Sequence, residues 1–464
     1  MARKITGNRL GLMTMLAAGT IAATSAHGQC DLQEVFKLLA SDGVSGDKFG
    51  YSAAISGTTV IVGAPFDPSY GDGAGAAYLY DSTTGMQIAV LVAEDGQPGD
   101  WFGRSVAISN TTAIVGASGD DDNGSNSGSV YVFDIITGQQ IAKLMPDDGA
   151  AGDRFGRSVA ISSIPALPDT IVLIGASGND DNGDNSGSAY LFNPTGLQIA
   201  KILPDDAQAL DHFGASVAID FPTAVITATW DDDNGMESGS AYVFDVSDLS
   251  NPVQQMKLLP DDGAPFDFFG TAAAMYGDTV IIASWQDDDL GEWSGSAYLF
   301  DTNTGGQIAK LLPEDGAARD FFGRSVAISD GVAIVGSAQF DGPGIDSGAA
   351  YLFDTVTGSQ FDKLVSSDSA SFDQFGSSVA INENAVFVGA HKDGDNGPDS
   401  GSGYIFGCYC PADINGDGVV DIFDMMEFLG WYSTGDMRAD WNSDGELNIL
   451  DLLAYLNDFA AGCE

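Results

Sequence analysis

The chain repeats one short motif, Asp-x-Phe-Gly, at a nearly constant interval along most of its length. Successive copies lie 53, 53, 58, 56, 53 and 53 residues apart, and their phenylalanines are Phe49, Phe102, Phe155, Phe213, Phe269, Phe322 and Phe375. This period is the size of a propeller blade and exceeds that of most short-repeat solenoids. We therefore expect a fold built from seven similar units.

Each unit has the pattern of four short strands. The motif is followed by the alternating segment "RSVAIS" (104–109) and the β-branched segment "TAIVGAS" (112–118). An acidic, glycine-rich loop comes next, then "GSVYVFD" (128–134), a turn and "QQIAKL" (139–144). Short β-branched segments separated by turn residues predict one antiparallel blade per repeat.

The two ends of the repeat array complement each other. The last repeat stops at "SGSGYIF" (400–406) without a "QIAKL" segment, and the first one is preceded by "QEVFKLL" (33–39). We predict that this N-terminal strand completes the final blade, which closes the ring and removes an exposed sheet edge. An open β-solenoid is the alternative, and the missing final strand argues against it.

The motif itself is expected to be structural. Its Phe should pack between blades, its Gly should allow a close backbone approach, and its Asp should cap a turn. The segments "DxFGxSVAI", "VGA" and "GSAYLF" resemble the FG-GAP repeats of integrin α-subunit propellers and of many secreted bacterial proteins. The resemblance implies a mainly β fold, a seven-bladed β-propeller over residues 29–409, used for adhesion or recognition.

Charge and the N-terminal segment restrict the partners and the location. With 66 acidic and 17 basic residues the net charge is −49, which opposes binding to nucleic acid or to an anionic lipid surface. Residues 1–28 combine Arg3, Lys4 and Arg9 with an apolar run and small residues, the pattern of a cleaved signal peptide. We expect a secreted or cell-surface protein with no membrane span.

Four cysteines allow three pairings in an exported protein. Aligning "EVFKL" with "QIAKL" and "YIF" with "YVF" places Cys30 and Cys408 at neighbouring positions of one hairpin turn. We therefore predict a Cys30–Cys408 disulfide, which leaves Cys410 and Cys463 to pair with each other.

The acidic loops of the repeats are candidate calcium sites with an incomplete pattern. Of these loops, only one offers oxygen ligands at alternate positions, from Asp180, Asn182 and Asp184. Calcium takes six to eight oxygens, so this is a possible propeller metal site beside the alternative that Asp and Asn form turns.

Departures from the repeat suggest where a ligand binds. Trp230, Trp285 and Trp293 occupy loop positions of two adjacent repeats and are a possible binding patch for a glycan or a protein, although they could instead cover their own loops. For the arginines that follow the Phe-Gly pair, we expect salt bridges to the acidic loops; they are Arg104, Arg157 and Arg324.

Catalytic motifs are absent from the sequence. His212 and His391 each stand alone in their repeats, and no nucleophile elbow or phosphate loop occurs. We predict a non-catalytic recognition protein. The alternative is a polysaccharide-active propeller enzyme, a lyase or a glycosidase, built from residues of several blades.

The C-terminal segment contains two twelve-residue calcium loops, "DINGDGVVDIFD" and "DWNSDGELNILD". Each has Gly at position 6 and runs into an amphipathic helix without a helix before it, so both are half EF-hands. We expect two calcium ions. The predicted ligands of the first loop are Asp413, Asn415, Asp417, Val419, Asp421 and Asp424, and those of the second are Asp440, Asn442, Asp444, Glu446, Asn448 and Asp451.

Residues 410–464 resemble a type I dockerin bracketed by Cys and Gly-Cys. The resemblance implies a small α-helical, calcium-dependent module that fastens the propeller to a cohesin-like or surface receptor. It departs from cellulosomal dockerins at loop positions 10 and 11, where Ile422, Phe423, Ile449 and Leu450 stand. A calcium-stabilised tail without a receptor is the alternative.

Overall fold

The computed structural model describes residues 32–69, 71–164, 170–408, 412, 414, 420–442 and 445–461. Leu32–Tyr409 forms one compact unit, and the segment that begins at Cys410 belongs to a second one. No described helix is long and apolar enough to cross a bilayer.

Seven four-stranded antiparallel sheets form the first unit. Blades 1 to 4 are, in chain order, β2 (Ser52–Ser56), β3 (Thr59–Ala64), β4 (Ala76–Asp81) and β5 (Gln87–Leu91); β6 (Phe102–Ser109), β7 (Thr112–Ala117), β8 (Ser129–Asp134) and β9 (Gln139–Leu144); β10 (Ser158–Ser163), β11 (Thr170–Ala176), β12 (Ser188–Phe192) and β13 (Gln198–Ile202); β14 (Phe213–Asp220), β15 (Thr223–Ala228), β16 (Ser240–Asp245) and β17 (Val253–Leu258).

The remaining sheets complete the ring. Blades 5 to 7 are β18 (Phe269–Tyr276), β19 (Thr279–Ser284), β20 (Ser296–Asp301) and β21 (Gln307–Leu311); β22 (Phe322–Ser329), β23 (Val332–Ser337), β24 (Ala349–Asp354) and β25 (Gln360–Leu364); β26 (Phe375–Ile381), β27 (Ala385–Ala390), β28 (Ser402–Cys408) and β1 (Leu32–Leu38).

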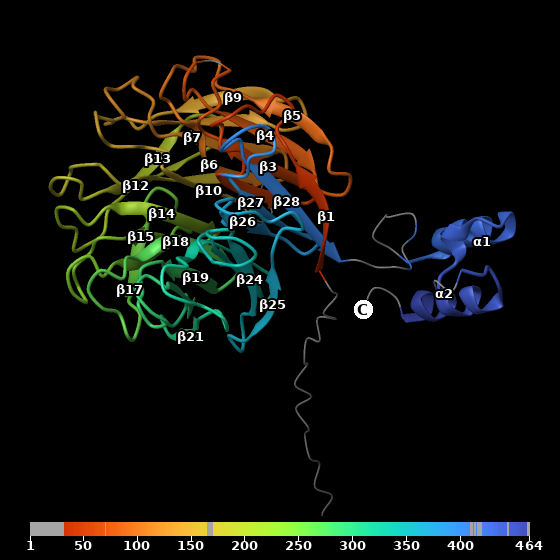
Figure 1. Ribbon diagram of the computed structural model, residues 1–464. Helices are drawn as coiled ribbons and strands as arrows, with labels where there is room; N and C mark the ends of the chain where they lie inside the picture. Colours follow the sequence, from red (N-terminus) through yellow and green to blue (C-terminus); the bar gives the residue numbers. More distant parts are fainter. Residues whose placement is uncertain are drawn as a thin grey trace, which may run out of the picture. The chain divides into compact units, whose positions relative to one another are not determined.

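The ring is closed in the way that the repeat ends predict. The first strand of each blade contacts the first strand of the next, and β26 of the last blade contacts β2 of the first. The N-terminal strand β1 pairs antiparallel with β28, with Leu32 opposite Cys408 and Leu38 opposite Gly403, and Figure 1 shows β1 in red beside β28 in blue. The seven-bladed propeller and its N-terminal closing strand are therefore confirmed.

Apolar clusters between neighbouring blades form the core. Phe102 is completely buried, and its ring meets Tyr131 and Phe133 edge to face at centroid distances of 5.4 and 5.8 Å. Gly75 (φ +86°) allows the backbone of one blade to approach Phe102 of the next, since a Cβ there would lie 2.0 Å from the Phe102 carbonyl oxygen. The expected packing role of the motif is confirmed.

The Asp of the motif closes a tight turn before each first strand. In blade 2 the Asp100 carboxylate accepts a 2.7 Å hydrogen bond from the Gln97 N–H, and the same contact recurs in every blade. All seven of these aspartates are buried. The turn-capping role expected of this Asp is also confirmed.

The second unit contains two helices, α1 (Ile422–Thr434) and α2 (Ile449–Ala461), and the short 3-10 helix η1 (Met437–Ala439). Asp421 caps α1 in a capping box with Asp424, and Gly435 ends the helix with φ 73°. The rings of Phe428 and Tyr455 stack at a centroid distance of 4.0 Å and join α1 to α2.

Candidate functional site

The first strands of the seven blades line a central channel with a volume of about 340 Å³. The first lining position follows the Phe-Gly pair and carries an arginine in three blades. The next is a serine in six blades, and the hydroxyl of Ser105, for example, donates a 2.8 Å hydrogen bond to the Gly156 carbonyl of the neighbouring blade. The serines are thus used to hold blades together, whereas the arginines face the channel.

One residue with a left-handed backbone precedes the first strand of every blade. The residue between Asp and Phe of the motif has a positive φ in every blade, from 51° to 57°, and none of the seven is glycine: Lys48, Trp101, Arg154, His212, Phe268, Phe321 and Gln374. Such a conformation is unfavourable for large side chains and is concentrated at functional sites. Because the same φ recurs in every blade whatever the residue, it belongs to the turn that precedes each first strand.

Six aromatic rings form a continuous row, the aromatic arc, across blades 4 to 6. Successive centroid distances are 4.5, 6.3, 6.5, 5.1 and 6.0 Å along the order His212, Trp230, Phe268, Trp285, Phe321 and Trp293. Trp230 and Trp293 are each 39% exposed, so the arc is accessible at both of these positions.

The structure thus brings together all three tryptophans that the sequence singled out. The residues that link them, Phe268 and Phe321, were missed because they belong to the motif, where only a packing role was expected. The available signal was the motif itself, which reads "DFFG" in these two consecutive repeats.

The prediction that the channel arginines form salt bridges with the acidic loops is wrong. Among the residues that the structure describes, Arg104, Arg157 and Arg324 have no carboxylate within ion-pair distance. Arg104 instead lies over the rings of Tyr51 and Trp101, at 5.7 and 5.3 Å, and Arg324 lies 5.6 Å over Trp285. In five blades, carboxylates of the acidic loops pair with another cation instead.

That cation is a lysine of the outer strand. In blade 2 the Lys143 ammonium lies 2.7, 2.9 and 2.6 Å from carboxylate oxygens of Asp95, Asp120 and Asp122. Burial alone would lower the pKa of Lys143, but its hydrogen bonds to these aspartates, Asp122 first, raise it well above the ordinary value. The lysine therefore neutralises the loop from within the blade.

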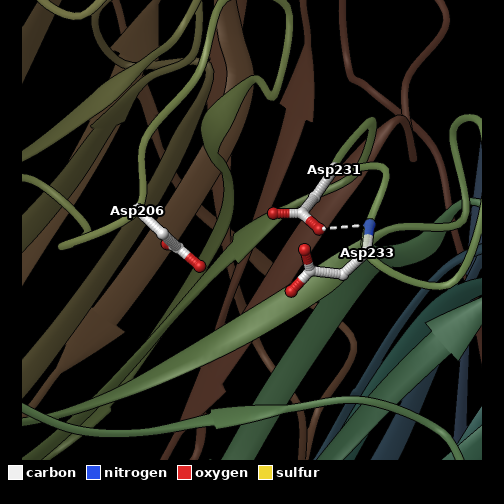
Figure 2. Close-up of side chains that lie close together, drawn as sticks. All are labelled: Asp206, Asp231 and Asp233. Carbon is white, nitrogen blue, oxygen red and sulfur yellow. Dashed lines mark hydrogen bonds between the residues drawn. The ribbon is translucent and has the colours of Figure 1, made fainter.

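A lysine also lies among the carboxylates of the two groups in the described residues that most resemble a metal site. Figure 2 shows Asp206, Asp231 and Asp233, whose oxygens lie within 4.8 Å of one another. The Lys257 ammonium contacts these three carboxylates at 2.8, 2.8 and 2.6 Å. The second such group in the described residues, around Asp393, likewise holds Lys37.

The proposed propeller ligands Asp180, Asn182 and Asp184 take part in their own turn. Asp180 accepts a 2.7 Å hydrogen bond from the Asn185 backbone, and Asp184 accepts one of 3.1 Å from the Asn185 side chain. A calcium ion at these residues stays a prediction.

One buried histidine faces both the channel and an adjoining hollow of about 380 Å³. His391 is 8% exposed, its ring meets Tyr51 at 5.6 Å, and its Nδ1 has no hydrogen-bond partner among the described residues. Burial, with Arg324 as the next contribution, lowers the pKa of His391 to about 3. The imidazole is therefore neutral at physiological pH.

The calcium loops are only partly described. Asp413, Asn415, Asp417, Val419 and Asp444 lie outside the described residues, as do Cys30, Cys410, Cys463 and the side chain of Cys408, so both predicted disulfides remain untested.

In the second loop, Asp440 accepts a 2.9 Å hydrogen bond from Gly445 N–H. Asp451 is fully buried and accepts hydrogen bonds from the backbones of Asn448 and Asn442, at 2.7 and 3.3 Å. Backbone N–H donors hold both carboxylates toward the interior of the loop.

Comparison with known families agrees with the blade pattern. The FG-GAP repeat family matches residues 32–80, 86–133, 139–192, 197–244, 252–300, 306–353 and 359–406. Each match begins with the outer strand of one blade and ends with the third strand of the next, which is the offset that ring closure requires. No curated protein matches the chain at a significant level. Because these seven matches cover most of the sequence, the chain belongs to the FG-GAP repeat family.

Proposed function

We propose that this protein is a secreted, non-catalytic recognition protein whose propeller binds a glycan or protein ligand through the aromatic arc. The observation that carries the proposal is the continuity of the six rings over three blades. Large, partly exposed aromatic side chains provide contact area at low entropic cost. The blade cores use different phenylalanines and tyrosines, so the packing of the fold does not account for the arc.

The C-terminal unit is proposed to bind two calcium ions and to attach the propeller to a receptor. The buried carboxylates Asp424 and Asp451, each held by backbone N–H groups, support this part. Carboxylates gathered in this way repel one another until a cation neutralises them. Exposed apolar pairs begin the two helices, with Phe423 63% and Ile449 58% exposed, and we propose that they contact the receptor.

The arc is tested by screening the secreted protein on a glycan array and on extracellular proteins, with reducing-end release measured on the same polysaccharides. Trp230→Ala, Trp285→Ala and Trp293→Ala should each weaken binding at least tenfold with little change in melting temperature. Tyr276→Ala is the matched control, since Tyr276 is 49% exposed at the opposite end of β18. A large loss of stability in the tryptophan variants would assign them to packing, and product release would favour the enzyme alternative.

Calcium binding is tested by calorimetry on the whole secreted chain. We expect about two ions per chain, from the two twelve-residue loops, and a loss of helical signal in chelator. Asp424→Ala and Asp451→Ala should each remove about one ion. An unchanged stoichiometry in both variants would contradict the assignment.

A further inference from the structure

The basic residues of this acidic chain are divided into two groups. Fourteen lie in the described residues, since Arg3, Lys4 and Arg9 do not. Eight of them are paired with carboxylates: Lys37, Lys143, Lys201, Lys257, Lys310, Lys363, Arg319 and Arg438. Six have no carboxylate within 4.0 Å among the residues that the structure describes: Lys48, Arg104, Arg154, Arg157, Arg324 and Lys392.

All six unpaired cations line one mouth of the propeller. Arg104, Arg157 and Arg324 line the central channel, and the other three line two hollows that share Arg157 or Arg324 with it. In a chain of net charge −49, chance would distribute cations among the many available carboxylates. Their convergence without ion-pair partners places six cations where an anionic group of a ligand could contact several of them.

The cations act on one another and on the buried histidine. Confinement in the channel, followed by the nearby Arg104, lowers the pKa of Arg157 to about 10. Burial is the main cause of the lowered pKa of His391, and the nearby charges of Arg324, Lys392 and Lys48 lower it further. His391 borders the channel, and its buried Nδ1 has no hydrogen-bond partner among the described residues. A negative group placed among these cations would reduce their mutual repulsion.

The cations also adjoin aromatic faces. Arg324 lies over Trp285 of the aromatic arc, and Arg104 lies over Tyr51 and Trp101. Guanidinium groups bind carboxylate and sulfate through paired hydrogen bonds, and aromatic side chains pack against the apolar body of a ligand. An anionic sugar unit has both features in one group, a charged substituent on an apolar-faced ring, whereas a peptide of Asp and Glu alone has no ring.

We propose that the channel mouth is a binding site for a short acidic glycan segment, whose carboxylate or sulfate group contacts Arg104, Arg157 and Arg324 while its sugar ring packs on the aromatic arc. This proposal rests on the proposed function and names its ligand class. The net charge opposes a long polyanion across the whole surface, which is why the site takes a short segment at a confined mouth.

Calorimetry with matched probes tests the charge requirement. Trigalacturonate is compared with its methyl ester, and a sulfated galactan trisaccharide with its desulfated form, so that one arm reports carboxylate and the other sulfate. At least one acidic probe should bind tenfold or more tighter than its neutral counterpart. Equal affinities in both arms would overturn the proposal, and equally tight binding of a hexa-aspartate peptide would overturn its glycan class.

Variants test the residues. Arg157→Gln and Arg324→Gln should each weaken the acidic probe at least tenfold and leave the neutral probe unchanged, with Arg324→Lys intermediate. Both should melt at or above the wild-type temperature, because each removes one of several like charges. Arg438→Gln, in the C-terminal unit, is the charge-matched control.

The two proposals fail in different ways. Wild-type affinity in both arginine variants would overturn the acidic site while leaving the aromatic arc intact if the tryptophan variants still lose binding. Failure of the wild-type protein to bind any glycan, acidic or neutral, or any extracellular protein would overturn the recognition function itself.

Discussion

Tyr78 lies opposite Val90 in the pairing of β4 with β5, at the register position where Tyr131 of the next blade lies opposite Lys143. Blade 1 therefore lacks the lysine that pairs with the acidic loop in five other blades; in blade 6 the equivalent Lys363 pairs with Asp315 alone among the described residues. The Tyr78 hydroxyl lies 2.9 Å from Asp42 and 2.7 Å from Asp67, and its single proton can be donated to only one of them at a time.

Restoring the lysine should stabilise the propeller. Val90 is 39% exposed, and from the same register position the Lys143 ammonium reaches Asp95 and Asp120 in the next blade, so a Val90→Lys variant should reach Asp42 and Asp67. Charge-assisted hydrogen bonds in a half-buried setting should contribute about 1–2 kcal/mol to the free energy of unfolding. Urea denaturation at pH 7 measures the change, with Val90→Met as the uncharged control of similar length. Equal stability of the Lys and Met variants would show that Asp42 and Asp67 need no cation.

Removing a lysine should have the opposite effect. In Lys257→Met the carboxylates of Asp206, Asp231 and Asp233 face one another without a cation, and only Asp231 is deeply buried. We expect a loss of about 2–3 kcal/mol in chelator and partial recovery in millimolar calcium, because the three oxygens are close enough to share an ion. Wild-type stability of this variant in chelator would contradict the neutralising role of Lys257.

The fold was predictable because every local signal is repeated seven times. The closing strand was predictable for the same reason, because the last repeat lacks a fourth strand and the N-terminal segment has the sequence of one. The tryptophans were noticed as departures from the repeat, but Phe268 and Phe321 were not, because their positive φ is invisible in a motif whose other residues pack the core.

The pairing of charges could not be predicted from proximity in sequence. Lys143 reaches Asp95 across 48 residues and Asp120 across 23 residues, and this geometry exists only once the outer strand is placed beside the loops. The arginines were assigned to those loops because nothing in the sequence shows that the carboxylates are already neutralised. The proposed anion-binding site follows from that pairing, because it leaves the arginines without carboxylate partners.

Stability should fall as the pH rises from about 4 to above 6. Burial raises the pKa of the motif carboxyl groups of Asp47, Asp100, Asp211, Asp267 and Asp320 from 3.8 to about 6. The folded state therefore binds more protons than the unfolded state between these values, and the stabilisation is lost as the pH rises through the folded pKa.

Other aspartates set the lower pH limit of this stabilisation. Asp95 and Asp262 have lowered pKa values: burial raises them, but hydrogen bonds from Lys143 and Lys310 outweigh it, so their contribution is lost as the pH falls below 3.8. We expect the free energy of unfolding measured with urea to be larger at pH 5 than at pH 7.5, by about 1 kcal/mol per motif carboxyl group. Asp100→Asn should reduce this difference. A larger free energy of unfolding at pH 7.5 would contradict the assignment.

The closing strand leads to the last prediction. Leu32 is the partner of Cys408 across β1 and β28, and Cys30 stands two residues earlier in the chain, so the sequence-predicted Cys30–Cys408 bridge would covalently secure the final blade. The loop that it closes spans the whole propeller, for which the chain-entropy account gives about 5 kcal/mol as an upper value. Non-reducing peptide mapping of the secreted protein should yield a Cys30–Cys408 peptide, and Cys408→Ser should melt at a lower temperature than wild type, with reductant abolishing the difference. A peptide that joins Cys30 to Cys410, the pairing that a continued strand register would favour, or to Cys463 would contradict the bridge while leaving the β1–β28 pairing as it is.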